Sequence, residues 1–288
     1  MNYSSPPILR WSAHTDIGRV RKNNEDSFLG IVLDTQEVSY LGKIGELSDY
    51  SKDYVFAVSD GMGGAMAGEF ASRIAVEKIT KMFPIYCSKK ITNHAAALEN
   101  DSFYQFLIAL FQEIHRALLL LSASYAECHG MGTTLTLCWI QHQRLYFAHI
   151  GDSRLYYLPK GGGIQQISED DTHVGWLFRQ GMITEYESKN HPRRNLLQKV
   201  LGADHQFVTP QVGFLTPAPG DRFLICSDGV NDGLFDAQLL DILNTFTPQS
   251  PAQHLVQEAV DRSGRDNATA IVIEYHFNFQ EKIEMSLS

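Results

Sequence analysis

Tyr54-Val55-Phe56-Ala57-Val58-Ser59-Asp60-Gly61 is an apolar run of strand length that ends in an acidic residue and a glycine. Its β-branched and aromatic residues favour a β-strand, and Asp-Gly is typical of the turn that follows a strand. The same order recurs at residues 222–226, an apolar run followed by Ser227-Asp228-Gly229. The sequence therefore predicts two strands that each end in an aspartate.

Similar strand-like runs occupy much of the remaining chain, at residues 27–33, 134–140, 144–150 and 269–275. Residues 141–143 are few enough to join two of these runs as a hairpin. Because the strands follow one another in runs, they predict antiparallel sheets rather than alternating βαβ units.

Apolar residues at helical spacing interrupt the strands. One long helix is predicted to stop at Pro84, and another to run through residues 103–121. Shorter helices are predicted after the N-caps Asp236 and Ser250, the second of them closed by Gly264. The fold class expected from these elements is α+β.

The chain shows no internal linker, repeat or low-complexity tract, so residues 1–288 are predicted to form a single domain. Residues 171–195 are polar, helical in pieces and rich in glycine and charge, which is typical of an excursion over the surface. The stretch 34–53 is longer than a tight hairpin and carries no chemical signal.

Composition excludes several classes of function. Hydrophobic residues make up 44% and charged residues 20% of the 288 residues, as in folded soluble proteins. Lys and Arg number 24 against 33 Asp and Glu, a net charge of −9 that argues against nucleic-acid binding. No basic-then-apolar signal region begins the chain, and the apolar run 117–126 is about half the length that spans a bilayer.

The four cysteines, Cys87, Cys128, Cys138 and Cys226, lack metal-binding or disulfide spacing. Cys138 and Cys226 lie in apolar runs and are predicted to be small buried hydrophobes. Together with the absence of a signal region, this predicts a reducing, cytoplasmic location without a membrane anchor.

Acidic residues gather at the predicted strand ends. They are Glu25-Asp26, Asp60, Asp152, Asp228 and Asp266. Any one of these residues could simply belong to a turn, where Asp side chains often hydrogen-bond the local backbone. Five together predict carboxylates that converge and need a divalent cation to offset their repulsion. Oxygen ligands without His or Cys select Mg²⁺ or Mn²⁺, and a two-metal site suits hydrolysis of a phosphate ester.

Seven ordered motifs resemble those of the metal-dependent, type 2C serine/threonine protein phosphatases of bacterial type, from about residue 11 to residue 275. They are Asp16-x-Gly18 with Arg21-Lys22-Asn23-Asn24-Glu25-Asp26-Ser27, Asp60-Gly61-Met62-Gly63-Gly64 with Gly68-Glu69, Gly132-Thr133-Thr134, Gly151-Asp152-Ser153-Arg154, Asp170-Asp171-Thr172, Ser227-Asp228-Gly229 and Arg265-Asp266-Asn267. The resemblance implies an αββα sandwich, in which antiparallel helix pairs flank two packed antiparallel sheets and the metal site lies at one end.

The resemblance also implies a role for individual residues. Asp60 would bridge two metals, Gly61 would give a backbone carbonyl to one of them, and Asp228 and Asp266 would complete the other. Glu25 and Asp26 would act through metal-bound water, and Asn267 would support Asp266. Arg21 would hold the substrate phosphate, a task that its planar fork suits.

Two further acids leave alternatives open. Asp170 is similar to the aspartate that holds a third metal together with the Asp228 equivalent, and its alternative role is the N-cap of a helix that starts near His173. Asp152 belongs to a strong motif, but an aspartate paired with Arg154 inside a hairpin is expected to be structural.

The activity that the resemblance implies is hydrolysis of phosphoserine and phosphothreonine on proteins. Metal-bound hydroxide would attack phosphorus directly, without a phosphoenzyme, with two or three Mn²⁺ or Mg²⁺ ions present. Met62 stands where eukaryotic members usually carry a histidine proposed as general acid, and methionine cannot donate a proton. The flap, residues 172–197, is where substrate selectivity is expected.

The expected partners are phosphorylated proteins, as substrates of a Ser/Thr kinase, and the protein itself is expected to be a monomer. One rival hypothesis is a catalytically silent phosphoprotein-binding module, against which the retained Arg21, Asp60, Asp228 and Asp266 argue. A second rival is a phosphatase dedicated to one regulatory protein of a signalling switch.

Overall fold

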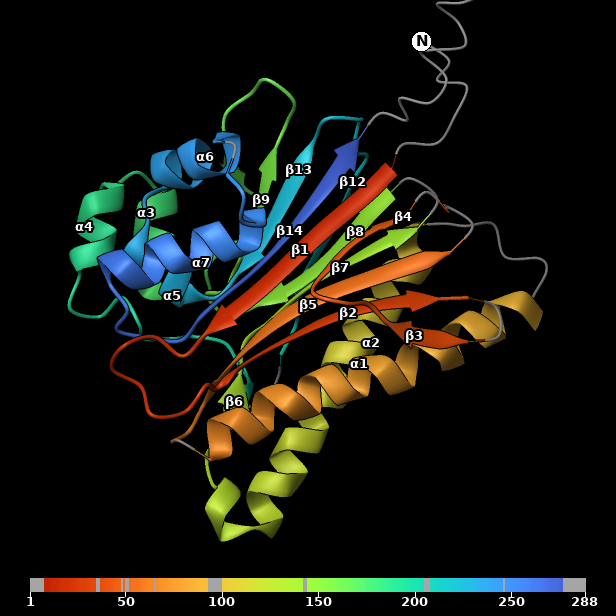
Figure 1. The fold of residues 1–288 in the computed structure, drawn as a ribbon. Helices are drawn as coiled ribbons and strands as arrows, with labels where there is room; N and C mark the ends of the chain where they lie inside the picture. Colours follow the sequence, from red (N-terminus) through yellow and green to blue (C-terminus); the bar gives the residue numbers. More distant parts are fainter. Residues whose placement is uncertain are drawn as a thin grey trace, which may run out of the picture.

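Two antiparallel β-sheets pack face to face, and helices cover the outer face of each sheet (Figure 1). The computed structural model describes residues 8–276 apart from 35–36, 48, 50–51, 65, 93–99, 142–143, 205–207 and 246. This arrangement confirms the predicted α+β sandwich. The turn expected at 141–143 lies in part outside the described residues, but Gln141 and Arg144 pair on either side of it.

The first sheet has the strand order β10-β9-β13-β14-β1-β4. Its strands are β1 (Ile8–Asp16), β4 (Ile44–Leu47), β9 (Arg154–Leu158), β10 (Gln165–Gln166), β13 (Arg222–Cys226) and β14 (Ala268–His276). The strand before Asp228 and the strand after Asp266 are therefore neighbours, since β13 pairs directly with β14.

The second sheet has the order β11-β6-β5-β7-β8-β12, and β2 joins it by pairing with β5 and β3. Its strands are β2 (Asp26–Leu33), β3 (Val38–Tyr40), β5 (Asp53–Met62), β6 (Gly132–Thr133), β7 (Leu135–Gln141), β8 (Arg144–Ile150), β11 (Leu201–Gly202) and β12 (Gln211–Leu215). The register of β2 and β5 places Asp26 directly opposite Asp60.

Helices divide between the two outer faces (Figure 1). The pair α1 (Ala67–Thr92) and α2 (Asn100–Ser124), with the short 3₁₀ helix η1 (Ala126–Cys128), covers the second sheet. The first sheet is covered by α5 (Asp228–Gly233), α6 (Asp236–Asn244) and α7 (Pro251–Arg262). The short helices α3 (His173–Arg179) and α4 (Glu185–Asn190) form the predicted excursion.

Strand β5 shows why its sequence is apolar on both faces. Val55 and Ala57 pack toward α1 and α2, whereas Tyr54, Phe56 and Val58 pack between the two sheets. Successive side chains of a strand point to opposite faces, so a strand buried on both sides needs a continuous apolar run. The run that begins at Tyr54 thus fixes this strand at the centre of the sandwich.

Two predictions about helix ends are wrong, for different reasons. Helix α1 contains Pro84 and continues past it. Beyond the proline, Tyr86 stacks on Phe106 of α2 with ring centroids 4.0 Å apart, and this packing helps to offset the roughly 3 kcal/mol cost of an internal proline. Helix α6 has Phe235, not Asp236, as its N-cap, and the Asp236 carboxylate accepts a hydrogen bond from the Tyr156 hydroxyl at 2.9 Å.

The N-cap at Ser250 is confirmed, since its side chain accepts a hydrogen bond from the Gln253 amide. Gly264, with φ of 59°, follows the end of α7 as predicted. Cys138 and Cys226 are fully buried, also as predicted, and no disulfide joins the four cysteines.

One segment within α2, Ser102–Ser124, is long and apolar enough to cross a membrane by length and composition alone. Its inner face packs on the second sheet, where Leu107, Leu110 and Phe111 are fully buried. The apolar character of this helix is thus explained in part by its place in the core.

Candidate metal and phosphate site

A cleft of about 420 Å³ opens at the end of the sandwich where strands of both sheets terminate. Its lining combines the loops before β2, β9 and β14, the end of β5, the start of α5 and the return arm of the flap. The site residues among the lining are Arg21, Glu25, Asp60, Gly61, Met62, Asp152, Asn195, Leu197, Asp228 and Asp266. The structure thus brings most of the sequence-predicted residues to one place.

The end of β5 is held rigidly. The Asp60 amide donates to Thr134 Oγ1 at 3.0 Å, and the Asp60 carbonyl accepts bonds from the Thr134 amide and the Thr133 hydroxyl at 2.8 Å each. At the next position, a Cβ on Gly61 would lie 1.9 Å from the Gly68 carbonyl oxygen, so only glycine fits here. The β5 backbone therefore approaches the start of α1 closely and fixes the Asp60 carboxylate at the cleft.

Asn267 organises the loop that carries Arg21 and Glu25. Its side-chain oxygen accepts a bond from the Glu25 amide at 2.8 Å, and its side-chain nitrogen donates to the carbonyls of Ile17 and Asn23 at 2.9 and 3.0 Å. Its backbone amide donates to Asp266 Oδ1 at 2.9 Å. The Asn267 side chain thus holds the neighbouring loop, which the sequence did not indicate, while its support of Asp266 as a metal ligand stays a prediction.

Carboxylates of the cleft repel one another. The pKa values of Asp60 and Asp228 are raised well above the usual range, first by burial and then by neighbouring aspartates, including Asp26. Burial also raises the pKa of Asp26 to about 6 and that of Asp152 to about 7. One oxygen of Asp26 and one of Asp228, the Oδ1 atom in each, are buried without a hydrogen-bond partner.

The donor set fits a divalent cation. The available donors are a backbone carbonyl and carboxylate oxygens that accept no hydrogen bond. Both are hard oxygen ligands, the kind that Mg²⁺ and Mn²⁺ prefer. Within the described part of the chain, no group of three or more His, Cys, Asp or Glu side chains stands close enough together to hold a metal ion as the side chains are placed. Asp266, for example, accepts a 2.6 Å bond from Arg21 Nη2, with the Arg21 side chain 47% exposed at the rim of the cleft.

Asp170 has a different environment from these acids. Its carboxylate accepts bonds from Arg154 Nε at 2.9 and 3.1 Å, from Arg154 Nη2 at 2.7 Å and from the Gln166 amide at 2.7 Å. Its charge is therefore already matched by an internal arginine. The alternative role of Asp170 as a helix cap is wrong, since Thr172 caps α3 by accepting the Gly175 amide.

The expected pairing of Asp152 with Arg154 is also wrong. Arg154 turns to Asp170 and to the Tyr156 hydroxyl, which leaves Asp152 facing the same cleft as Asp60 and Asp228. The contacts therefore favour Asp152 over Asp170 as a further metal ligand. The signal was present in the sequence, because Gly151-Asp152 is one of the acidic strand ends.

Met62 lines the cleft and is 37% exposed. The side chain offers no proton donor at this position, as the sequence indicated.

Comparison with known proteins decides the family. A family profile described as protein phosphatase 2C matches residues 44–263. The serine/threonine phosphatase stp of Listeria innocua is 32% identical over 266 residues, which cover 90% of this chain and 93% of that protein. The chain belongs to the protein phosphatase 2C family. The family predicted from the seven motifs is thus confirmed.

Two further matches, a protein and a solved structure that both carry the name PstP, give more information. The serine/threonine protein phosphatase PstP of Mycobacterium tuberculosis is 33% identical over 271 residues, or 93% of this chain, but the chain spans only 45% of its length. A solved structure of the PstP catalytic domain in complex with two manganese ions superposes with a TM-score of 0.72 at 30% identity, covering 94% of this chain and 99% of that one. Manganese in that relative is the type of cofactor predicted here.

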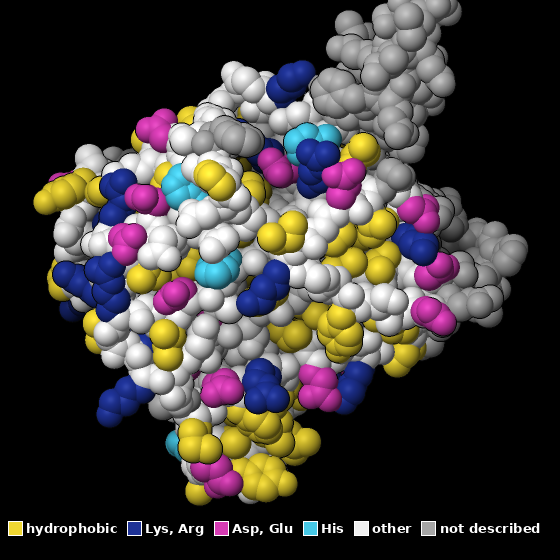
Figure 2. Space-filling view, in the orientation of Figure 1, with side chains coloured by type: hydrophobic (Ala, Val, Ile, Leu, Met, Phe, Trp, Pro, Cys, Tyr) yellow, Lys and Arg dark blue, Asp and Glu magenta, His cyan; other side chains and the backbone are white. Residues whose placement is uncertain are grey.

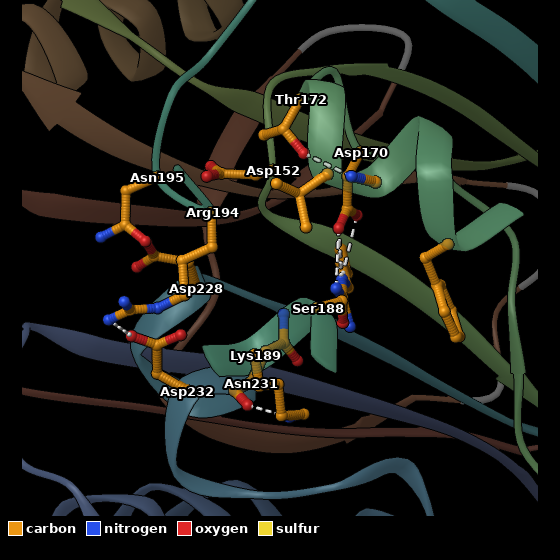
Figure 3. A pocket seen from close by; sticks show the side chains of 14 residues that line it. Asp152, Asp170, Thr172, Ser188, Lys189, Arg194, Asn195, Asp228, Asn231 and Asp232 are labelled. Carbon is orange, nitrogen blue, oxygen red and sulfur yellow. Dashed lines mark hydrogen bonds and ion pairs between the residues drawn. The ribbon is translucent and has the colours of Figure 1, made fainter. Parts of the chain in front are cut away.

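The flap borders the cleft on one side. Asn195 and Leu197 on its return arm line the cleft, and Thr172 pairs with Leu197 at its base. Between the flap and α5 lies a smaller cavity of about 60 Å³, into which Asp152, Asp170 and Asp228 also face (Figure 3). The flap is therefore placed to contact a substrate bound at the acidic cluster.

Proposed function

We propose that this chain is a metal-dependent serine/threonine protein phosphatase that hydrolyses phosphoserine and phosphothreonine in proteins. The observation that carries the proposal is the cleft in which uncompensated carboxylates, above all Asp60 and Asp228, lie beside a partly exposed arginine, Arg21. The names of the relatives, serine/threonine phosphatases, support the same activity.

The residues that would hold metal are Asp60, the Gly61 carbonyl, Asp228 and Asp266, with Asp152 as the further acid that faces the same space. Glu25 lines the same cleft and Asp26 is buried next to it, and both would act through water. A bound divalent cation would neutralise these charges, polarise the phosphate and lower the pKa of water enough for hydrolysis at neutral pH. The buried acceptors of Asp26 and Asp228 would then have a partner.

Arg21 would bind the phosphate of the substrate. The Asn267 side chain anchors its loop through the carbonyls of Ile17 and Asn23, so the guanidinium is presented at the edge of the cleft. A guanidinium donates two parallel bonds to phosphate oxygens, which orients the phosphorus as well as neutralising charge.

We also propose the finer properties of the protein. The substrates would be phosphoproteins produced by a Ser/Thr kinase, and the chain would act as a cytoplasmic monomer with one catalytic domain over residues 1–288. The cleft is lined by the end of β5 in the second sheet and by residues that directly follow β13 and precede β14 in the first sheet, Asp228 and Asp266, which supports a single catalytic unit. On the face seen in Figure 2, acidic and basic side chains are interspersed rather than gathered into a basic patch, which fits a protein partner better than nucleic acid.

Phosphopeptide hydrolysis tests this function. Activity should be absent in EDTA and return when Mn²⁺ or Mg²⁺ is added in excess. Asp261→Asn is a suitable control for variants of the cleft aspartates, because it removes the same charge at a distant place. Asp261 lies on α7 in an exposed ion pair with Arg19. Full activity in EDTA, or a phosphorylated form of the enzyme trapped during turnover, would contradict the proposal.

A further inference from the structure

The flap helix α4 has little apolar attachment to the rest of the molecule. All residues of Glu185–Asn190 are described, and none of them is buried. Tyr186, its one large apolar side chain, is 67% exposed. Packing of apolar surface therefore cannot explain why Lys189 of α4 lies beside Asn231 of α5 (Figure 3).

Lys189 supplies one polar attachment. Its ammonium donates to the carbonyl of Asn231 and, at 2.6 Å, to the carbonyl of Leu234. These carbonyls belong to the last turn and the C-cap of α5, where a helix leaves acceptors unsatisfied and where a positive charge is favourable. The ammonium also lies 4.7 Å from the centre of the Phe235 ring, and the side chain is only 13% exposed.

Glu185 supplies the second attachment, one helical turn earlier. Its Oε1 atom accepts a 3.1 Å bond from the amide of Asp236, the first residue of α6. A carboxylate is favourable at the start of a helix for the same reason that a cation is favourable at the end. Since residues four apart share one helix face, Glu185 and Lys189 together hold both sides of the α5–α6 junction.

This junction is close to the catalytic cluster. Helix α5 begins with Asp228, and the flap continues from α4 to Arg194, which pairs with Asp232 of α5 at 3.3 Å. Asn195 follows and lines the large cleft. The position of α4 on α5 therefore determines where the return arm of the flap stands relative to a bound substrate.

We propose that Glu185 and Lys189 form a polar clamp that docks the flap on the α5–α6 junction and thereby positions Arg194 and Asn195 to contact the protein part of a phosphorylated substrate. The inference rests on the proposed function. The clamp residues are positioning residues. Neither lines the cleft that holds Asp60 and Arg21, although Lys189 lines the smaller cavity that Asp228 also faces, so their expected effect is on substrate binding rather than on the chemistry at phosphorus.

Lys189→Met tests the clamp, because methionine keeps most of the side-chain length and removes the charge. Lys81→Met is the matched control: Lys81 forms an i,i+4 pair with Glu77 on α1, as Lys189 does with Glu185, but it is 65% exposed. Lys189→Arg keeps the charge and should retain most of the parent behaviour. A melting curve for each variant confirms that it is folded.

Amide hydrogen exchange of the Mn²⁺-loaded protein gives the first readout. Loss of charge-assisted bonds should speed exchange in residues 185–190 by about 10- to 100-fold in Lys189→Met, with no change in Lys81→Met. Unchanged exchange in residues 185–190 would overturn the clamp. This readout needs no phosphatase activity.

Steady-state kinetics gives the second readout. KM for a phosphopeptide should rise by about 10-fold in Lys189→Met, in line with the loss of a charge-assisted contact, whereas kcat/KM for p-nitrophenyl phosphate should change less than about 2-fold. Equal losses on both substrates would place Lys189 in the chemical step and contradict the inference. If the parent enzyme hydrolyses neither substrate with Mn²⁺, the proposed function fails, and hydrogen exchange still decides whether the clamp exists.

Discussion

Asp170 and Asp228 face the same small cavity, yet their surroundings differ in charge. The Asp170 carboxylate is paired with Arg154 and with the side-chain amide of Gln166, so both of its oxygens accept hydrogen bonds. Asp228 has a buried oxygen without a partner, and burial with the charges of Asp152 and Asp232 raises its pKa. An aspartate whose charge is balanced by an arginine contributes to the stability of the fold, whereas one without a counter-charge is available to bind a cation.

The largest effect is expected from the unmatched acids. Asp60→Asn and Asp228→Asn should lower kcat by at least about 1,000-fold, because losing metal-based stabilisation costs several kcal/mol. The fold should remain intact or become more heat-stable without metal, since one repelling charge is removed. Turnover with excess Mn²⁺, alongside a melting curve in EDTA, checks both parts. Near-parent turnover in either variant would remove it from the ligand set.

The opposite outcome is expected for the matched acid. Asp170→Asn leaves the Arg154 guanidinium buried without its counter-charge, which should lower the free energy of unfolding by about 3–5 kcal/mol. The double variant Arg154→Met/Asp170→Asn should recover part of that loss, because both charges are then gone. Urea unfolding of the three proteins measures the difference. A single variant as stable as the parent would show that the two aspartates do not differ as described.

The prediction for Arg21 concerns binding of the substrate phosphate rather than of metal. Arg21→Ala should raise KM for phosphopeptides by about 10- to 100-fold, the loss of a charge-assisted bidentate contact. Inhibition by inorganic phosphate should weaken in parallel. Lys22→Ala, a change at a neighbouring residue that also lines the cleft, is the control. If phosphate inhibits Arg21→Ala as strongly as it inhibits the parent, Arg21 does not contact the substrate.

A smaller, pH-dependent effect is expected at Asp152. Its pKa is about 7 in the folded protein against an ordinary value of 3.8, with burial as the main cause. The folded state therefore binds this proton more tightly than the unfolded state does. As a result, the free energy of unfolding falls as pH rises from about 4 through 7. Asp152→Asn removes that loss, so in EDTA it should stabilise the protein by about 2 kcal/mol more at pH 8 than at pH 5.

Urea unfolding at the two pH values measures this difference. The comparison with the parent removes contributions from titrating groups that do not interact with Asp152, whereas Asp228, whose pKa the Asp152 charge raises, changes with it. An equal difference at pH 5 and pH 8 would mean that Asp152 is not held in a raised-pKa environment.

Much of the sandwich and of the cleft could be predicted from the chain because the signal is local. The apolar run at Tyr54 and the Ser-Asp-Gly sequence after it lie within eight residues and specify both a strand and an acid at its end. Asp228 and Asp266 could each be placed at a strand end for the same reason, whereas their meeting at one site depends on the pairing of β13 with β14 and was implied by the family resemblance.

Long-range contacts could not be predicted. Arg154 meets Asp170 because β9 and β10 pair in antiparallel register, which carries the chain back past the arginine. Helix α1 continues beyond Pro84 because Tyr86 stacks on Phe106 of α2. Lys189 reaches carbonyls of α5 that lie 42 and 45 residues further along the chain. In each case a partner distant in sequence decides the local structure.

Calorimetric titration of metal-free protein with Mn²⁺ at pH 7.5 tests the central claim most directly. The parent should bind at least two Mn²⁺ ions, and Asp261→Asn should match it. Asp228→Asn should lose at least one site or bind about 100-fold more weakly, since a charged oxygen ligand is replaced by a neutral amide. Unchanged stoichiometry and affinity in Asp228→Asn would contradict the conclusion that the unmatched carboxylates form the metal site.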